Sequence, residues 1–303
     1  MSPVRTKGKQ NDEYLGERHV YEPHRAGLPP VIPYFKELWR RRSFAFELAR
    51  TQMHAANTDT FFGQAWLVIN PLLLAGVYFL LVMVIGGHSG STEAAKAFFA
   101  LLTSGLFLFN FITGSMQNGA TSLTQGGRLI LNTPFPKMLL TVSTTYLAFR
   151  RYLPTLVVYF VIHVVMGLRF TWNMLWMIPI LILAAMTGLG LANIFATLQV
   201  YFRDTASFLP YFIRIWLYLS PILWTVEQLE QREANGSRLA GVLLELAPAN
   251  PIFGLLAAQG EILNEGVAPN PKLLLIALAW AVGALVVGSM LLMSREREFA
   301  VRL

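Results

Sequence analysis

The segment Leu273–Met293, LLLIALAWAVGALVVGSMLLM, decides the fold because it contains no charged side chain. An apolar run of about 20 residues is long enough to cross the hydrocarbon core of a bilayer as one α-helix. A single crossing segment must be helical, because lipid offers no hydrogen-bond partner to free backbone groups. This segment therefore predicts a membrane-spanning helix.

Working outward, five more apolar runs predict an all-α integral membrane protein with six transmembrane helices. The composition agrees, because 54% of the residues are hydrophobic and 14% are charged, whereas soluble domains carry about 25% charged residues. Cysteine is absent, which excludes disulfides and thiolate metal sites. The six expected spans cover residues 65–85, 97–116, 137–166, 172–200, 208–224 and 273–293.

The basic residues predict the orientation of these spans. Ten Lys and Arg residues precede the first expected span, and Arg295, Arg297 and Arg302 follow the last. The loops on the opposite side are poor in basic residues, with Lys96 after the first span and Arg169 after the third. Because cytoplasmic flanks carry the basic excess, we expect a multi-pass protein of the bacterial inner membrane with both termini in the cytoplasm.

Three regions divide the chain. Residues 1–30 are polar and contain proline, so we expect a disordered cytoplasmic tail. In residues 31–60, apolar side chains such as Phe35 and Trp39 recur near helical spacing, with basic residues largely on other faces. This pattern predicts an amphipathic interface helix, which is either an anchor alone or an anchor with a docking surface. Residues 61–303 form the transmembrane domain.

Residues 225–272, between the last two expected spans, are too many for a simple turn. They contain two short apolar segments, Leu239–Leu246 and Ile252–Leu263. Asn250 and Pro251 supply an N-cap and a first-turn proline for the second segment. Because neither segment is long enough to span, we expect two short re-entrant helices. A small external subdomain is the alternative.

The sequence contains no motif for nucleotide or metal chemistry. It lacks the Gly-x-x-x-x-Gly-Lys-Ser/Thr phosphate loop, and its five histidines share no ligand spacing. Gly188 and Gly190 lie inside an expected span, where small residues let helices approach closely. No span holds a pair of carboxylates, which argues against a proton relay. We therefore expect no enzyme, no metal, no cofactor and no nucleic-acid partner.

Arginines interrupt two expected spans. Arg150 and Arg151 lie in the third span and Arg214 in the fifth, and such charges must face water, a partner or a lumen. The pair either reaches the inner headgroups by snorkelling or forms a basic entrance for a pyrophosphate-linked lipid. Arg214 either faces a lumen or pairs with an acid such as Asp204. The candidate headgroup entrance comprises Arg40, Arg41, Arg42, Arg150 and Arg151.

Aromatic side chains gather in and beside the first and fifth expected spans. Tyr and Trp combine a flat apolar face with a polar group, which suits the faces of sugar rings. Interfacial belts are the alternative use of the same residues. The candidate channel lining comprises Trp66, Tyr78, Tyr211, Trp216 and Tyr218.

The loop between the second and third expected spans lies on the cytoplasmic side and carries a short helical pattern. Ser122 and Gln125 fit a capping box at its start. We expect its apolar side chains, Leu129, Ile130 and Leu131, to be exposed. Exposed apolar side chains favour a docking surface, and a helix lying flat on the bilayer is the alternative.

Four motifs stand out along the chain: Gly63-Gln-Ala-Trp66 leading to Asn70-Pro71, Arg128-Leu-Ile with Pro134-Phe-Pro136-Lys137, Tyr201-Phe-Arg203-Asp204 with Leu219-Ser220-Pro221-Ile222, and Asn250-Pro251-Ile252. Together they resemble motifs of the membrane subunits of type-2 ABC exporters. The resemblance covers roughly residues 31–295 and is to the branch that exports O-antigen, teichoic acid or galactan. Within that branch the chain looks most like the galactan-lipid exporter permease.

The resemblance implies an ATP-driven exporter of a lipid-linked polysaccharide, with an O-antigen-like polymer or galactan as cargo. It implies a homodimer bound to two separate ATPase subunits that hold ATP and Mg. The ATPase would couple through Gln125, Arg128, Leu129, Ile130, Phe135 and Lys137. An outer gate would include Pro221, Asn250 and Pro251.

Three other functions are compatible with part of the sequence. The same architecture could export a drug or a lipid. A membrane-embedded glycosyltransferase or acyltransferase would need a polar catalytic cluster at one membrane face, which the sequence lacks. A scaffold that transports nothing is the third alternative.

Overall fold

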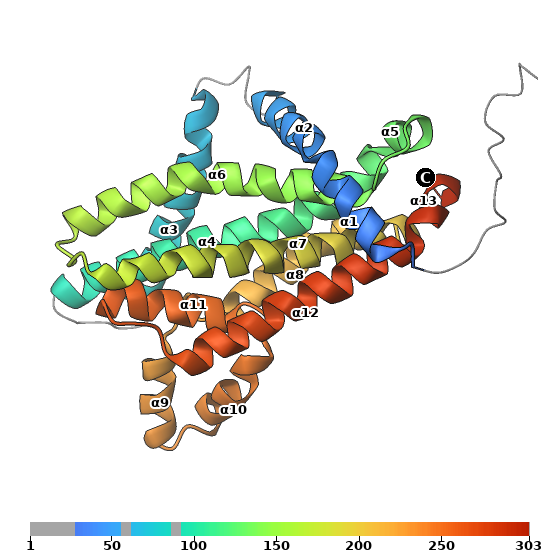
Figure 1. Ribbon diagram of the computed structural model, residues 1–303. Helices are drawn as coiled ribbons and strands as arrows, with labels where there is room; N and C mark the ends of the chain where they lie inside the picture. Colours follow the sequence, from blue (N-terminus) through green and yellow to red (C-terminus); the bar gives the residue numbers. More distant parts are fainter. Residues whose placement is uncertain (1–27, 56–61, 86–91, 303) are drawn as a thin grey trace, which may run out of the picture.

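The computed structural model describes residues 28–55, 62–85 and 92–302, which fold into α-helices joined by short turns, with no strand among them (Figure 1). The predicted all-α fold class is confirmed for this part of the chain. The expected tail, residues 1–30, lies almost wholly outside the described residues.

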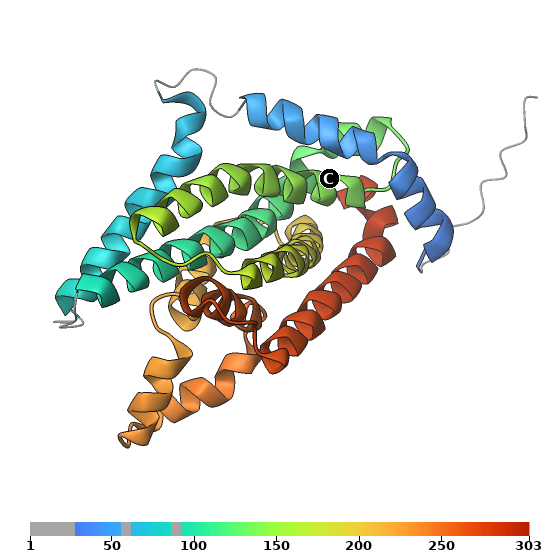
Figure 2. The same cartoon turned by 60° about the vertical axis from the view of Figure 1, so that its left-hand side comes forward.

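The described part of the expected interface-helix region forms two helices, and their location in a membrane interface stays a prediction. These are α1, Val31–Arg40, and α2, Arg42–Ala55, and the chain bends between them at Arg41. Figure 2 shows both helices lying across one side of the molecule, with α2 over α6. Ala45 and Ala49 of α2 are fully buried there, whereas α1 buries no residue. The bend at Arg41 therefore divides the expected single helix into two, which follow the surface of the bundle.

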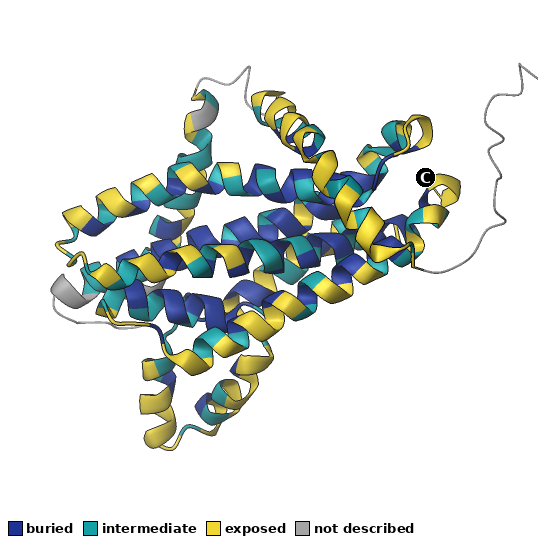
Figure 3. Cartoon of the chain, viewed as in Figure 1, coloured by how far each residue is buried: buried dark blue, intermediate teal, exposed yellow. Residues whose placement is uncertain are grey.

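The core of the bundle is α4, flanked by α6 and α7, with α12 packed on the far side of α7. Figure 3 shows that α4 is largely buried, whereas α6, α7 and α12 each have a partly exposed outer face. The bounds of these long helices, with α3 at one edge, are α3 Trp66–Ile85, α4 Thr92–Gln125, α6 Met138–Val165, α7 Met177–Tyr201 and α12 Pro271–Arg295.

Four helices of the described chain are long and apolar enough to cross a membrane: Ala95–Gln125, Met138–Val165, Trp172–Tyr201 and Pro271–Arg302. The bent pair Arg238–Ala249 and Phe253–Glu265 would bring the count to five. The six expected spans are therefore confirmed only in part.

The first and fifth expected spans are the ones that stay unconfirmed. The apolar stretch of α3 that the structure describes in full is Trp66–Leu80, which is shorter than a span. The fifth expected span corresponds to α8, which covers Thr205–Leu219 and ends before the expected limit at Trp224. At 1.5 Å per residue, α8 is about 22 Å long, less than the roughly 30 Å hydrocarbon core.

Between α8 and α12 lie three further helices. The two expected short helices are present as α10, Arg238–Leu246, and α11, Phe253–Gly260, with a bend of 108° between the extended pair. The sequence analysis missed α9, Val226–Ala234, although Thr225 and Gln228 form a capping box at its start. Short helical turns complete the chain at Gly63–Ala65, Trp172–Trp176, Ala247–Ala249, Glu261–Glu265 and Glu296–Glu298.

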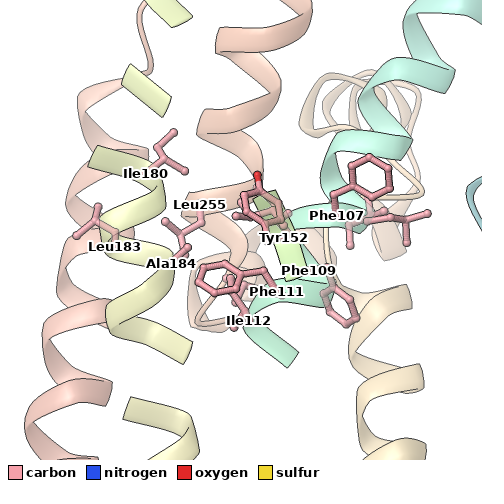
Figure 4. Close-up of a cluster of buried hydrophobic side chains, with 14 of the residues drawn as sticks. Phe107, Phe109, Phe111, Ile112, Tyr152, Ile180, Leu183, Ala184 and Leu255 are labelled. Carbon is pink, nitrogen blue, oxygen red and sulfur yellow. The ribbon is translucent and has the colours of Figure 1, made fainter. Parts of the chain in front are cut away.

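A continuous apolar core ties these elements together, and Figure 4 shows its centre. Phe107, Phe109 and Phe111 of α4 meet Tyr152 of α6 and Leu255 of α11 in this core. Because α11 contributes fully buried side chains, it is an integral part of the bundle. The predicted re-entrant helix thus has the protein burial that its backbone needs, while its depth in a bilayer stays a prediction.

Glycines set the closest helix contacts, as the sequence predicts. A Cβ atom at Gly190 of α7 would lie 2.3 Å from the carbonyl carbon of Ala284 in α12. A Cβ atom at Gly188 would lie 3.0 Å from the Cβ atom of Ser115 in α4. Small residues therefore allow α7 to touch both neighbours by its backbone.

Candidate functional site

The expected coupling segment lies at one end of the long helices, and the turn between α6 and α7 lies at the other (Figure 1). Here α4 runs on to Gln125, and α5, Gly127–Asn132, follows after one residue. The predicted capping box is wrong, because Ser122 lies inside the continuous α4 and its Oγ donates a hydrogen bond to the Gly119 carbonyl, at 2.7 Å. The start of α5 instead follows from Gly126, where a Cβ atom would lie 2.7 Å from Leu140.

The exposure of the expected coupling residues divides them into two groups. Gln125 and Arg128 are exposed and Leu129 is half-buried. The expectation that Ile130 is exposed is wrong, since its side chain is 5% exposed and packs in the same cluster as Phe135. The cause is tertiary packing, because α5 contacts the C-terminal helix α13, Phe299–Arg302.

The apolar side chain that α5 leaves exposed is Leu131, at 58%. Together with Arg128 it gives α5 an outer face with one apolar and one positively charged group. The coupling role of the expected residues stays a prediction. The structure divides this segment into an exposed surface, at Gln125, Arg128 and Leu131, and a buried support, at Ile130 and Phe135.

A carboxylate that the sequence analysis did not single out holds this end together. Glu296 accepts a hydrogen bond from the Tyr34 hydroxyl at 2.6 Å, and its other oxygen accepts from the Lys137 backbone N–H at 2.9 Å. We call these three residues the Glu296 junction. It joins the N-terminal helix α1, the start of α6 and the end of α12, which are far apart in the sequence.

Burial shapes the electrostatics of the junction. It raises the pKa of Tyr34 well above its ordinary value, an effect that the Glu296 carboxylate reinforces. Tyr34 therefore stays a neutral donor across the physiological range. Burial lowers the pKa of Lys137, opposed by the attraction of Glu296. No sequence signal distinguishes Glu296 from other charged residues after the last span, because its partners come from distant segments.

The expected headgroup entrance does not form one cluster. The Arg40 side chain pairs with Glu37 at 2.6 Å. Arg41 also contacts Glu37 and donates to the Pro134 carbonyl at 2.7 Å, so it ties α1 to the loop after α5. Arg42 lies over the Trp39 ring at 4.6 Å. These three side chains are therefore engaged locally.

Arg150 and Arg151 are neighbours in sequence but point into different cavities. Arg150 lines a cavity of about 310 Å³ between α6 and α2, together with Glu47 and Arg50. Arg151 lines another of about 380 Å³ between α3, α4 and α6. Successive residues of a helix are about 100° apart, which explains the separation. A single entrance built from all five arginines is therefore wrong.

The expected channel lining divides in the same way. Tyr211 and Tyr218 of α8 are 68% and 50% exposed, and the Tyr78 and Tyr218 rings meet edge to face, with centroids 6.5 Å apart. Trp66, at the start of α3, is half-buried and lines the same cavity as Arg151. Trp216 is 7% exposed, so a channel-lining position for it is wrong in this chain.

Trp216 instead fixes the expected outer gate. Its indole N–H donates to the Asn250 side-chain oxygen at 2.8 Å, and the Asn250 amide donates to Ser220 Oγ at 3.0 Å. The same Asn250 oxygen accepts from the Ile252 backbone N–H at 3.1 Å. The predicted N-cap role of Asn250 is wrong, because α11 begins at Phe253 and its N-cap residue is Ile252. Pro221 is buried beside this network. The end of α8 and the start of α11 are thus held by one asparagine.

Replacing Trp216 with phenylalanine is expected to lower the thermal stability of the detergent-solubilised protein. The change keeps an aromatic ring in the core but leaves the Asn250 oxygen with one donor fewer, a cost of about 1–3 kcal/mol. The matched control is Trp172→Phe, because Trp172 is 89% exposed. Equal melting temperatures for the two variants would contradict a structural role for this hydrogen bond.

The comparisons with known proteins cover almost the whole chain. It is 24% identical over 271 residues to the O-antigen export system permease protein RfbA of Myxococcus xanthus, covering 89% of this chain and 99% of that protein. The chain is therefore similar to an O-antigen export permease over most of its length. A protein of the same name from Klebsiella pneumoniae is 27% identical over 207 residues, covering 68% of this chain and 74% of that protein. The chain matches no protein-family model.

The resemblance to permease subunits of type-2 ABC exporters in the O-antigen branch is thereby confirmed, whereas the resemblance to a galactan-lipid exporter stays a prediction. The expectation that this subunit is not itself an enzyme is also confirmed, because the relatives are named as permeases of an export system. Several apolar helices and these export permeases agree on a multi-pass membrane protein.

Proposed function

We propose that this chain is the membrane subunit of an ATP-driven exporter that moves a lipid-linked polysaccharide across the bacterial inner membrane. The similarity to O-antigen export permeases over 89% of the chain carries this proposal. A separate ATPase supplies the energy, since the sequence has no phosphate-binding loop. In this arrangement both termini are cytoplasmic, and α3 and α8 complete six spans. A galactan is the polymer that the family resemblance favours.

The exposed faces of α3 and α8 support a pore between two copies of the chain. Phe208, Tyr211, Ile215 and Tyr218 of α8 are exposed at helical spacing. The edge-to-face contact of Tyr78 with Tyr218 places this stripe beside α3. Exposed faces on the two short helices are explained when a second copy covers part of them and the remainder lines a conduit.

A conduit lined by tyrosines suits a sugar polymer. Each Tyr presents an apolar face to the ring and a hydroxyl to its polar edge. The polymer is too long for one closed pocket, so it needs a continuous path with repeated weak contacts. A drug or single-lipid exporter would instead need one enclosed site, and the exposed tyrosine stripe favours the polymer.

The proposed power stroke enters through α5. Closure of the ATPase around ATP pushes on Arg128 and Leu131, the exposed groups of α5. The Glu296 junction carries this push to α1, α6 and α12, because it bonds all three. The ATPase must contact α5 differently in its open and closed states, because a partner shifts a conformational equilibrium only through such a difference.

Reconstitution tests the proposal directly. The chain is purified with its partner ATPase, placed in liposomes, and supplied with a fluorescent lipid-linked galactan. We expect ATP-dependent movement of the sugar to the other leaflet, and cross-links between α8 of two copies. A monomeric chain that leaves the ATPase activity unchanged would overturn the proposal, and movement of the lipid without its sugar would favour a lipid exporter.

Replacing Tyr211 and Tyr218 together with alanine is expected to slow export about 30-fold, because two stacking surfaces of roughly 1 kcal/mol each are removed. Assembly with the ATPase should be unchanged, since both side chains are exposed in the single chain. The matched control is Phe160→Ala with Phe170→Ala, two exposed aromatics near the α6–α7 turn. Equal export rates in the two double variants would place the conduit elsewhere.

A further inference from the structure

A cavity of about 380 Å³ opens between α3, α4 and α6, and we call it the Arg151 cavity. Figure 4 shows three aromatic residues of its wall, Phe107 and Phe111 of α4 and Tyr152 of α6. The polar residues that line it are Asn70, Asn110, Asn118, Arg151 and Thr155. Its volume is within the usual range for a small-molecule site.

The charge in this cavity has no partner in the described chain. Arg151 Nε is buried without a hydrogen bond, and Arg151 forms no ion pair with another described residue. The described lining of the cavity contains no carboxylate. A guanidinium inside a membrane protein without an anion nearby is costly. The cavity therefore suits an anion that the described residues do not supply.

The amides of the cavity complement this charge. Asn70 and Asn110 make no side-chain hydrogen bond within the described residues, so both retain free N–H donors. Asn118 uses its amide N–H on the Gly114 carbonyl at 2.7 Å and so helps to hold the wall. Arginine and amide donors that surround one point suit a phosphate, which has several oxygens, better than they suit a single carboxylate.

The position of the cavity along α6 indicates its depth. Phe46 of α2 stacks near Tyr146 of α6, with ring centroids 4.6 Å apart. Arg151 is five residues further on, or about 7.5 Å along the axis. If α2 lies in the cytoplasmic interface, as an amphipathic helix beside a bundle does, the cavity lies just inside the headgroup layer.

We propose that the Arg151 cavity binds the phosphate of a lipid headgroup from the cytoplasmic leaflet. Arg151 supplies the charge, Asn70 and Asn110 donate hydrogen bonds, and the lipid tails leave along α3. The inference rests on the proposed function for its membrane depth, and it assigns to Arg151 alone a role that the sequence analysis gave to five arginines. Arg150, in its separate cavity beside Glu47, takes no part.

The test measures lipid binding to the purified full-length chain by native mass spectrometry. The probes are dioleoyl phosphatidic acid and dioleoylglycerol, which share their tails and differ by the phosphate. We expect the wild type to prefer phosphatidic acid, and Arg151→Gln to weaken that binding about tenfold by loss of a charge-assisted contact. Arg151→Lys should retain part of the preference, and the matched control Arg150→Gln should retain all of it.

Three outcomes overturn the proposal. The first is an unchanged preference in Arg151→Gln. The second is an equal loss in Arg150→Gln, which would indicate a general surface charge effect. The third is displacement of phosphatidic acid by millimolar inorganic phosphate, which would make free phosphate the ligand. If Arg151→Gln does not fold, Asn70→Leu with Asn110→Leu must lose the preference in its place.

The proposed function can fail separately from this site. Arg128→Glu with Leu131→Asp on α5 should abolish export yet leave the preference for phosphatidic acid intact, because both residues lie outside the cavity. A wild-type chain that prefers phosphatidic acid but exports no sugar with its ATPase would refute the exporter and keep the site. A chain that exports sugar but shows no preference for phosphatidic acid would refute the site and keep the exporter.

Discussion

Replacing Gly190 with valine is expected to prevent folding of the membrane domain, or to destabilise it by about 3 kcal/mol or more. A Cβ atom at this position would lie 2.3 Å from the Ala284 carbonyl carbon and 2.5 Å from the Leu285 amide nitrogen. Both are backbone atoms of α12, so no side chain can rotate away. The contact is mutual, since a Cβ atom at Gly288 would lie 2.2 Å from the Gly190 carbonyl oxygen.

Expression yield, gel-filtration profile and melting temperature of the solubilised protein measure this effect. The matched control is Gly283→Val in α12, because a Cβ atom at Gly283 would meet nothing within 4 Å. Valine has a higher helix propensity than glycine, so the control should fold at least as well as the wild type. If both variants melt at the same temperature, the close approach of α7 and α12 does not limit stability.

Reversing the exposed face of α5 with Arg128→Glu and Leu131→Asp is expected to abolish export while the chain still folds. Both side chains are exposed, so no core contact is lost. At an interface, a reversed charge and a buried carboxylate in place of leucine should together weaken ATPase binding by about 100-fold or more. Co-purification of the ATPase and ATP-driven sugar export measure the two consequences.

Two further variants locate the effect on this face. Arg238→Glu with Leu239→Asp in α10 changes the same residue types, also exposed, away from α5, and should leave ATPase binding intact. Ile130→Asp should instead unfold the domain, because that side chain is buried with Phe135 and Phe299. Normal export by the α5 double variant would refute the coupling surface.

Much of the fold follows from hydrophobicity alone. The third expected span, residues 137–166, is α6 at Met138–Val165, and the fourth, 172–200, ends with α7 at Tyr201. Long apolar runs predict spans reliably, because a span must be helical over its whole length. The second expected span is shorter than α4, because the last turns of α4 are polar and leave the apolar run behind.

The sites were harder to predict because they depend on which face of a helix is covered. Ile130 and Leu131 are adjacent and equally apolar, and packing near Phe299 from the far end of the chain decides that Ile130 is the buried one. Trp216 is an aromatic residue of the type that lines sugar channels. Its indole N–H instead donates to Asn250, which lies far along the chain. Periodicity over a short helix cannot encode such distant partners.

The length of α4 has a mechanical consequence. Its 34 residues are helical without interruption, which gives a rod of about 51 Å against a hydrocarbon core of roughly 30 Å. One end adjoins α5, and the rod also contacts α11 on its way through the bundle. A rigid strut of this kind does not bend, so under the proposed function a tilt imposed at the α5 end of α4 is transmitted to its other end.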